Sequence, residues 1–279
     1  MKAIQTFQEL KERVLARSQS YRIAAVKPED EATREALRRI QEEGLAEVIT
    51  VDGDTPEAAA QEAVALVRNG KADVLMKGLI GTDQLLRAVL NKETGLLPSG
   101  HVLTHMAVAE LPNYPKLLYF TDAAVIPYPT HEQRIEQVHY AVQIAHQLGI
   151  EEPKIALIHC AEHGGKQFPF VDGYADIKQQ AAAGDFGACL VDGPMDVRTA
   201  CDAEALRTKH MTSPLNGEAD VLVLPDIEAG NVFYKTLSFF ASARTAGMLC
   251  GTIAPVVVPS RGDDAEAKFN SVVFALASL

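Results

Sequence analysis

Ser260 and Arg261 follow a short apolar segment near the C-terminus and precede two acidic residues, Asp263 and Asp264. A hydroxyl and a guanidinium side by side can bind the oxygens of one phosphate or carboxylate group. An aspartate at a helix start accepts a hydrogen bond from a backbone N–H, so Asp263 or Asp264 could begin the final helix. The plainer alternative is a helix cap beside a solvated arginine. The chemistry that this segment favours is oxyanion binding.

A second candidate anion site lies at Met76–Thr82, where an apolar segment runs into Lys77 and Gly78. A glycine lets a ligand approach the backbone, and Thr82 could cap a helix that carries Arg87 one turn further on. The segment lacks the GxxxxGK[ST] pattern of a Walker loop. An ordinary turn with surface Lys and Arg is the alternative.

A third polar segment runs from Pro225 to Asn231, after another apolar run. Asn231 could cap a helix from Val232 and do nothing more. His101 and His105 lie close together after a glycine-rich turn, where histidines are more often structural than catalytic.

Two other patterns do not support a site. The segment His159–His163 spells H-x-x-E-H, but it begins at a strand end and runs into Gly164, whereas a zinc site of this type needs a helix. No GxGxxG follows a predicted strand, so a Rossmann dinucleotide site is not indicated. The four cysteines form no CxxC pair, and we expect reduced thiols.

Composition limits the classes of protein. The chain has 279 residues, 47% of them hydrophobic, and a formal net charge of −11. At roughly 150 residues per domain this length predicts about two domains. The acidic balance disfavours nucleic acid and anionic membranes as partners. Because no run approaches the ~20 apolar residues of a membrane span and the start resembles no signal peptide, we expect a cytoplasmic protein.

Apolar runs of strand length alternate with helical patterns along the chain. Capping patterns predict helices after Thr55 and from Thr130 to Leu148. Continuously apolar strands separated by helices are typical of parallel strands buried on both faces, so we expect an α/β, parallel-sheet-rich layered fold. The predicted strands are 21–26, 46–51, 72–76, 117–121, 154–159, 188–191, 219–224 and 255–258.

A polar break at 150–153 is the best candidate for a domain crossing. It predicts one α/β domain from residues 1–152 plus 253–279 and a second from residues 153–252.

Several longer segments resemble the phosphate acyltransferases, and within them the phosphate butyryltransferase branch. The resemblance extends from about Ala72 to the C-terminus and rests on ADVLMKGLIGTDQLLRAVLNKETGL, HVLTHMAVAELPNYPKLLYFTDAA, LGIEEPKIAL, LVDGP, EADVLVLPDIEAGNVFYKTLSFF and VVVPSRGDDAEAKFNSV. It implies a two-domain fold similar to the isocitrate and isopropylmalate dehydrogenases, a homodimer, and an active site in the cleft between domains. The implied reaction is acyl-CoA plus phosphate giving acyl phosphate plus CoA, with coenzyme A as a substrate and no bound cofactor or metal.

The resemblance also assigns roles to residues. Ser260 and Arg261 match the pair that binds the transferred phosphate, and Arg87 matches an arginine that faces the same site. The glycine-rich turn of the butyryl branch matches Lys77, Gly78 and Thr82, and the E-A-G-N motif contains Asn231. The resemblance also makes His105 a candidate binding residue.

One departure concerns the base for the CoA thiol. The acetyl-transferring relatives place an aspartate at the position of Ala267, whereas Asp263 and Lys268 fit the spacing of the butyryl branch. Asp263, Asp264 and Glu266 therefore remain as candidates for the base. A thiol of pKa ~8.5 is only slightly ionised at pH 7, so a base or a cationic pocket would help.

Alternatives remain open. The acyl group could pass directly between CoA and phosphate, or through a covalent intermediate on Cys160, which lies at a strand end. The preferred chain could be acetyl instead of butyryl, because a methylene in an apolar pocket is worth only ~1 to 3 kcal/mol. The chain could also be a CoA-binding homologue without activity. A dehydrogenase is disfavoured, because no carboxylate-rich metal pattern is present.

Overall fold

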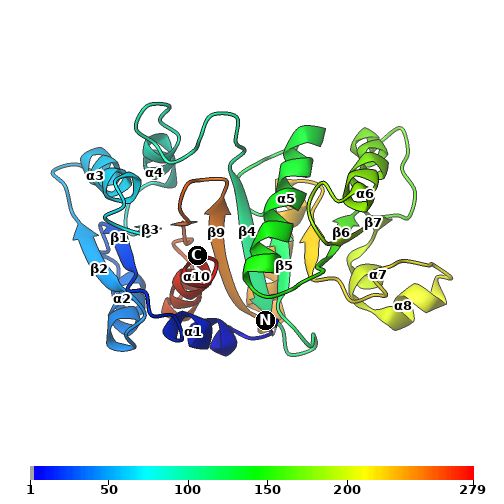
Figure 1. Cartoon of the computed structure of the whole chain (residues 1–279), viewed down its shortest axis with the longest axis horizontal. Helices are drawn as coiled ribbons and strands as arrows, with labels where there is room; N and C mark the ends of the chain where they lie inside the picture. The colour runs from blue at the N-terminus through cyan, green and yellow to red at the C-terminus, as the bar shows by residue number, and fades with distance from the viewer. Residues whose placement is uncertain (1–2) are drawn as a thin grey trace. The chain divides into compact units, whose positions relative to one another are not determined.

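The computed structural model describes residues 3–279 and divides them into two compact α/β units (Figure 1). Unit 1 contains residues 3–5 and 104–243, and unit 2 contains residues 6–103 and 244–279. In the described chain, no helix is long and apolar enough to cross a membrane.

The sheet of unit 2 has the strand order β2-β1-β3-β10-β9. All neighbours are parallel except β9, which is antiparallel to β10. The elements of this unit are α1 (Phe7–Leu15), β1 (Arg22–Val26), α2 (Glu31–Glu42), β2 (Glu47–Val51), α3 (Pro56–Arg68), β3 (Val74–Lys77), α4 (Thr82–Val89), β9 (Arg244–Cys250), β10 (Val256–Val257) and α10 (Ala265–Ala277).

Connection handedness sets the layers of unit 2. The chain steps outward from β1 to β2 and then back over β1 to β3, so right-handed crossovers put α2 and α3 on opposite faces of the sheet. Helix α10 packs against β9, β3, α1 and α2, whereas α3 packs on α4 and on the first three strands. Helix α10 (red in Figure 1) is buried along almost its whole length, and Arg17 caps it by donating to Leu276 O (3.0 Å) and Ala277 O (3.1 Å).

The sheet of unit 1 has the order β4-β5-β8-β6-β7, with β4 antiparallel to β5 and the other pairs parallel. Its elements are β4 (Thr104–Glu110), β5 (Leu118–Thr121), α5 (His131–Gln147), β6 (Lys154–Ile158), the 3₁₀ helix η1 (Pro169–Asp172), α6 (Gly173–Ala183), β7 (Leu190–Met195), α7 (Val197–Cys201), α8 (Ala203–Thr208), β8 (Val221–Val223) and α9 (Ile227–Phe240).

All eight predicted strands are present, with boundaries shifted by at most four residues, and the α/β, largely parallel fold class is confirmed. Both firm helix predictions are also confirmed. Thr55 accepts from Ala58 N and begins α3, while Thr130 and Gln133 form the capping box that begins α5. The strands that sequence patterning missed are β4 and β9, the antiparallel strand of each unit.

The division into units differs from the predicted one. The polar break at 150–153 is a loop inside unit 1, because α5 before it packs on β5 and β8, and β6 after it pairs with β8. The chain instead passes between units next to β4 and β9. A polar loop between a helix and a strand has the same composition as a linker, so sequence alone did not separate the two.

Candidate active site

The carboxyl ends of three adjacent parallel strands in unit 2 carry most of the predicted site residues. The register places Val26 opposite Lys77 and Val257 opposite Met76, so β1, β3 and β10 end side by side. Each strand leads into a loop and a helix N-terminus, the arrangement that gathers anionic ligands in open α/β sheets. We call these three loops, residues 27–30, 77–81 and 258–264, the strand-end site.

Gly78 allows the first two loops to touch. Its N–H donates to Val26 O (2.8 Å), and Leu79 N donates to Lys27 O (2.7 Å). A Cβ atom at residue 78 would lie 2.2 Å from Lys27 O, which no side chain permits. Gly78 is thus required for backbone packing, and any effect on a ligand acts through the shape of the turn.

Ser260 and Arg261 lie in an exposed turn after β10. The carboxylate of Asp263 accepts from Ser260 N (2.8 Å), and Ser260 Oγ accepts from Gly262 N (3.4 Å). The Ser260 hydroxyl proton is therefore available to an oxyanion. Arg261 forms no ion pair within residues 3–279, so its guanidinium is also available to a ligand.

Lys77 is buried, with 4% of its surface exposed, although it is a lysine at the end of a strand. Its Nζ donates to Gly78 O (3.2 Å) and Ile80 O (3.4 Å). Burial lowers the pKa of Lys77, and the nearby charges of Arg261 and Lys268 lower it further, against opposing effects of Asp30 and Asp263. These interactions place the three basic side chains in one neighbourhood.

Lys268 lies in the first turn of α10 and is 3% exposed. Its Nζ donates to Asp30 Oδ1 (2.6 Å) and Thr33 Oγ1 (3.0 Å). Asp30 is also the N-cap of α2 and accepts from Thr33 N (2.9 Å). Burial raises the pKa of Asp30, but the hydrogen bonds from Lys268 and Thr33 outweigh it and lower the pKa to about 2. One carboxylate therefore joins two helix N-termini at the strand-end site.

Sequence reasoning missed Asp30. Ligands gather where a parallel strand ends and leads into a helix N-terminus. Asp30 also lies between a strand end and a helix, so this rule could have found it.

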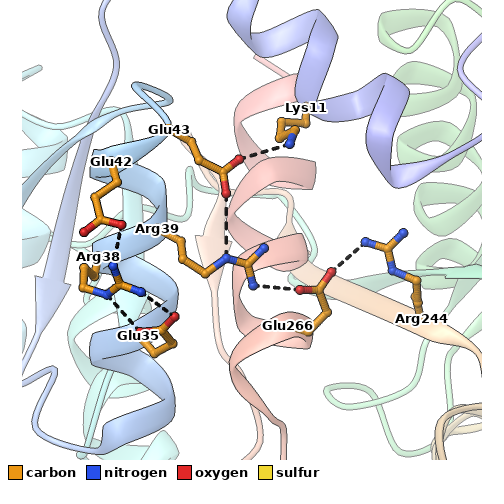
Figure 2. Close-up of polar contacts among 8 residues, drawn as sticks. All are labelled: Lys11, Glu35, Arg38, Arg39, Glu42, Glu43, Arg244 and Glu266. Carbon is orange, nitrogen blue, oxygen red and sulfur yellow. Dashed lines mark hydrogen bonds and ion pairs between the residues drawn. The ribbon is translucent and has the colours of Figure 1, made fainter.

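The candidate bases on the α10 side are all engaged. Glu266 accepts from Arg39 Nη1 (2.7 Å) and Arg244 Nη2 (2.6 Å), and Figure 2 shows it between these two arginines in a chain of ion pairs that continues from Arg39 through Glu43 to Lys11. Burial raises the pKa of Glu266, but the hydrogen bonds and charges of Arg39 and Arg244 outweigh burial, so the net pKa is lowered. Asp264 is the N-cap of α10 and accepts from Ala267 N (2.8 Å).

Thr82 and Arg87 belong to α4, which follows the second loop. Thr82 does not cap this helix as predicted: it is the first helical residue, and Gly81 is the N-cap, with its N–H bonded to Gln84 Oε1 (2.9 Å). Arg87 is 78% exposed and pairs with Asp83 (3.4 Å). Arg87 lines a cavity of about 220 Å³ between α3 and α4, and no hydrogen bond or ion pair within residues 3–279 joins it to Ser260 or Arg261.

His105 and Asn231 lie in unit 1. His105 is on β4 and buried, and Asn231 is inside α9, where its Nδ2 donates to Ala123 O (3.3 Å). The prediction that Asn231 caps a helix from Val232 is wrong, because α9 begins at Ile227 with Asp226 as its N-cap. Asp226 accepts from Ala229 N at 2.8 Å, so an earlier acidic residue already fills that role.

Asp122, which sequence reasoning also missed, accepts a hydrogen bond from His105 N, and the next residue, Ala123, accepts one from Asn231. The Asp122 carboxylate is 1% exposed and accepts from Thr104 Oγ1 (2.8 Å), His105 N (3.3 Å) and the backbone N–H groups of 124–126. Gly230 lets α9 approach this loop, because a Cβ there would lie 1.9 Å from Asp122 O. Asp122 thus holds the start of β4 and the loop after β5 together.

The H-x-x-E-H segment does not lie on a helix. His159–His163 lies in a loop after β6, and among residues 3–279 no group of three His, Cys, Asp or Glu side chains is placed to hold a metal ion. Cys160 Sγ lies 3.9 Å from both ring nitrogens of His159. At this distance the contact is a weak one, longer than the hydrogen bond by which a base activates a nucleophile.

The chain matches known proteins over nearly its whole length. The family described as phosphate acetyl/butaryl transferase matches residues 54–276. The phosphate butyryltransferase of Clostridium acetobutylicum is 36% identical, over 98% of this chain and 97% of that protein.

Comparison with solved structures also finds a phosphotransacylase. A branched-chain phosphotransacylase from Enterococcus faecalis superimposes with a TM-score of 0.82 at 32% identity, covering 92% of this chain and 98% of that one. A putative 4-hydroxythreonine-4-phosphate dehydrogenase from Salmonella typhimurium, at TM-score 0.55 and 12% identity over 94% of this chain and 100% of that one, shares the fold alone. This chain belongs to the phosphate acetyl/butaryl transferase family.

Proposed function

We propose that this protein transfers a short acyl group, butyryl or similar, between coenzyme A and inorganic phosphate. The observation that carries the proposal is the convergence of Ser260, Arg261 and the buried basic residues Lys77 and Lys268 at the strand-end site. An acidic protein needs such a local cluster to hold phosphate. Family membership supplies the reaction class.

The chemistry follows from positioning and charge. The Ser260 hydroxyl and the Arg261 guanidinium bind phosphate, and the helix N-termini of the three loops add partial positive charge. Phosphate held in line with the thioester carbonyl attacks directly, and nearby cations stabilise the developing oxyanion. The transfer occurs in a ternary complex without an acyl-cysteine, in keeping with the long contact of 3.9 Å between Cys160 Sγ and the ring nitrogens of His159.

The test is phosphate-dependent release of free CoA thiol from acetyl-, propionyl-, butyryl- and isobutyryl-CoA. We expect release that requires phosphate and is fastest with a four-carbon chain, while arsenate supports acyl-CoA hydrolysis through an unstable acyl arsenate. An acetyl preference would change the substrate and keep the reaction. CoA binding without turnover of any acyl-CoA would replace the enzyme with a non-catalytic CoA binder.

We also propose that neither metal nor bound cofactor takes part, since positioning and fixed charges suffice for this transfer. Activity should persist after dialysis against EDTA. Loss of activity that zinc restores would contradict the proposal and bring the His159–His163 segment back into consideration.

A homodimer is the oligomeric state that we propose. Helix α9 exposes a stripe of large apolar side chains, with Val232 66%, Phe239 80% and Phe240 78% exposed. Spacings of seven and eight residues place them on one helix face, and such a patch is typical of an interface.

A cytoplasmic location accords with reduced thiols such as Cys189 and Cys201 and with acyl-CoA substrates.

A further inference from the structure

The reaction proposed above leaves one proton without a carrier. Acyl transfer from CoA to hydrogen phosphate moves a proton from a phosphate oxygen to the thiol sulfur. Of the three carboxylates near Ser260, Glu266 is held by two arginines, Asp264 caps α10, and Asp263 accepts from Ser260 N. Each of these carboxylates is committed to holding the loop or the helix.

Lys77 is the remaining titratable group at the strand-end site with no acidic partner. None of the ion pairs in residues 3–279 involves it, and its Nζ has two acceptors, Gly78 O and Ile80 O. An ammonium has three N–H donors, whereas a neutral amine has two donors and one lone pair. Two carbonyl acceptors thus match the neutral amine and leave its lone pair free to accept a proton.

The surroundings of Lys77 also shift its protonation equilibrium toward the neutral form. Burial disfavours an ammonium at Lys77 most strongly, and Arg261 from the β10 loop and Lys268 from α10 repel it further. Asp30 and Asp263 act in the opposite direction, but Asp30 is bonded to Lys268 and Asp263 to the Ser260 turn. The cation from the adjacent strand end, Lys27, pairs with Glu29 (3.4 Å).

We propose that Lys77 is the proton carrier between phosphate and the CoA thiol, a role that rests on the proposed function. As phosphate attacks the thioester, the neutral amine takes the proton of the attacking oxygen, the new C–O bond forms, and the C–S bond breaks. The resulting ammonium gives that proton to the departing thiolate, which leaves as CoA thiol. In reverse, the amine deprotonates the thiol and returns the proton to the departing phosphate, so the resting state is restored in both directions.

Lys77→Arg separates a proton carrier from a mere anion-binding cation. Arginine keeps the positive charge but does not lose its proton at any pH at which the protein is folded. We expect kcat to fall at least ~100-fold while the KM for phosphate changes less than about threefold, the size expected for loss of general acid–base catalysis. The matched control is Lys71→Arg, at an exposed lysine just before the same strand, which should leave kcat unchanged.

Lys77→Ala and small amines provide the second test, which holds even if the arginine variant fails to fold. With folding verified by circular dichroism, methylamine should restore turnover of Lys77→Ala in proportion to the neutral amine, and should not affect the wild type or Lys71→Ala. The wild-type kcat should fall at acidic pH, where Lys77 is protonated, and this fall should be absent from Lys77→Ala.

Two results would overturn the role of Lys77: wild-type kcat in Lys77→Arg, or a folded Lys77→Ala that methylamine does not rescue. Either leaves the proposed function standing, provided that the wild type releases CoA in a phosphate-dependent manner. If the wild type releases none, the proposed function fails first, and the two failures are thereby distinguished.

Discussion

Arg261 illustrates how single residues at this edge are left available for a ligand. Its guanidinium makes no ion pair within residues 3–279, although the chain carries 37 acidic residues. The turn that presents it is held by Asp263 through Ser260 N. The Asp263 carboxylate thus fixes the backbone of the turn and leaves the charge of Arg261 uncompensated.

Replacing Arg261 with alanine should therefore remove a charge that stabilises the transition state. We expect kcat/KM for phosphate to fall at least ~100-fold, because loss of one such donor typically has this effect. Steady-state kinetics of CoA release measures it, with Arg198→Ala, an exposed arginine of unit 1, as the control. Near-normal activity of Arg261→Ala would remove this residue from the mechanism.

Asp30 is the residue whose protonation should be visible in stability. Its pKa in the folded protein is about 2 instead of 3.8. Because the folded-state pKa is lowered, its contribution is fully present above about pH 4 and is lost as the pH falls toward 2. Replacing this aspartate with asparagine would retain the helix cap but not the charge that pairs with Lys268.

We therefore expect Asp30→Asn to be less stable than the wild type by about 2 kcal/mol at pH 7, with the difference shrinking between pH 4 and pH 2. Guanidinium unfolding at several pH values measures this difference. The exposed Asp54→Asn should show no such difference. A gap of the same size at pH 7 and pH 2.5 would contradict the pairing of Asp30 with Lys268.

At the level of elements, the ion pairs of Figure 2 hold three helices and a strand of unit 2 together. Lys11 of α1 pairs with Glu43 after α2, Glu43 with Arg39 of α2, and Glu266 of α10 joins Arg39 to Arg244 of β9. These side chains are 26–44% exposed, so solvent weakens each pair. The network positions α10, and with it Lys268, more than it stabilises the fold.

Glu266→Gln separates this structural role from a catalytic one. We expect a loss of about 0.5 to 1 kcal/mol in the free energy of unfolding and a kcat within about twofold of the wild type. Urea unfolding and CoA-release kinetics test both. The conservative Glu35→Gln, in the separate Arg38 cluster of α2, is the control. A kcat reduced ~100-fold in folded Glu266→Gln would make Glu266 the base after all.

The whole molecule has two α/β units, and α9 of unit 1 carries the exposed apolar stripe. If this stripe is the dimer interface, a charge there should separate the subunits. We expect Phe239→Lys to sediment as a monomer under conditions in which the wild type is a dimer. Leu15→Lys, at an exposed leucine of unit 2, should stay dimeric. A monomeric wild type, or a dimeric Phe239→Lys, would contradict the assigned surface.

Local signals make the strand ends predictable. The parallel strands read as apolar runs because both of their faces are buried, and the caps at Thr55 and Thr130 act within three residues. Strand ends in such a sheet gather ligands whatever the details of packing, so the sequence by itself points to Lys77, Ser260 and Arg261. The family is likewise visible in the sequence, because its motifs are contiguous.

The remaining features depend on partners that are distant in sequence. Strands β4 and β9 exist because β5 and β10 offer antiparallel edges, and a helix–strand loop at 150–153 has the composition of a linker. Asp30 and Lys268 meet across 238 residues. Burial, which separates the amine of Lys77 from an ordinary surface lysine, comes from the packing of α10 and α2 over the sheet, and no local pattern encodes it.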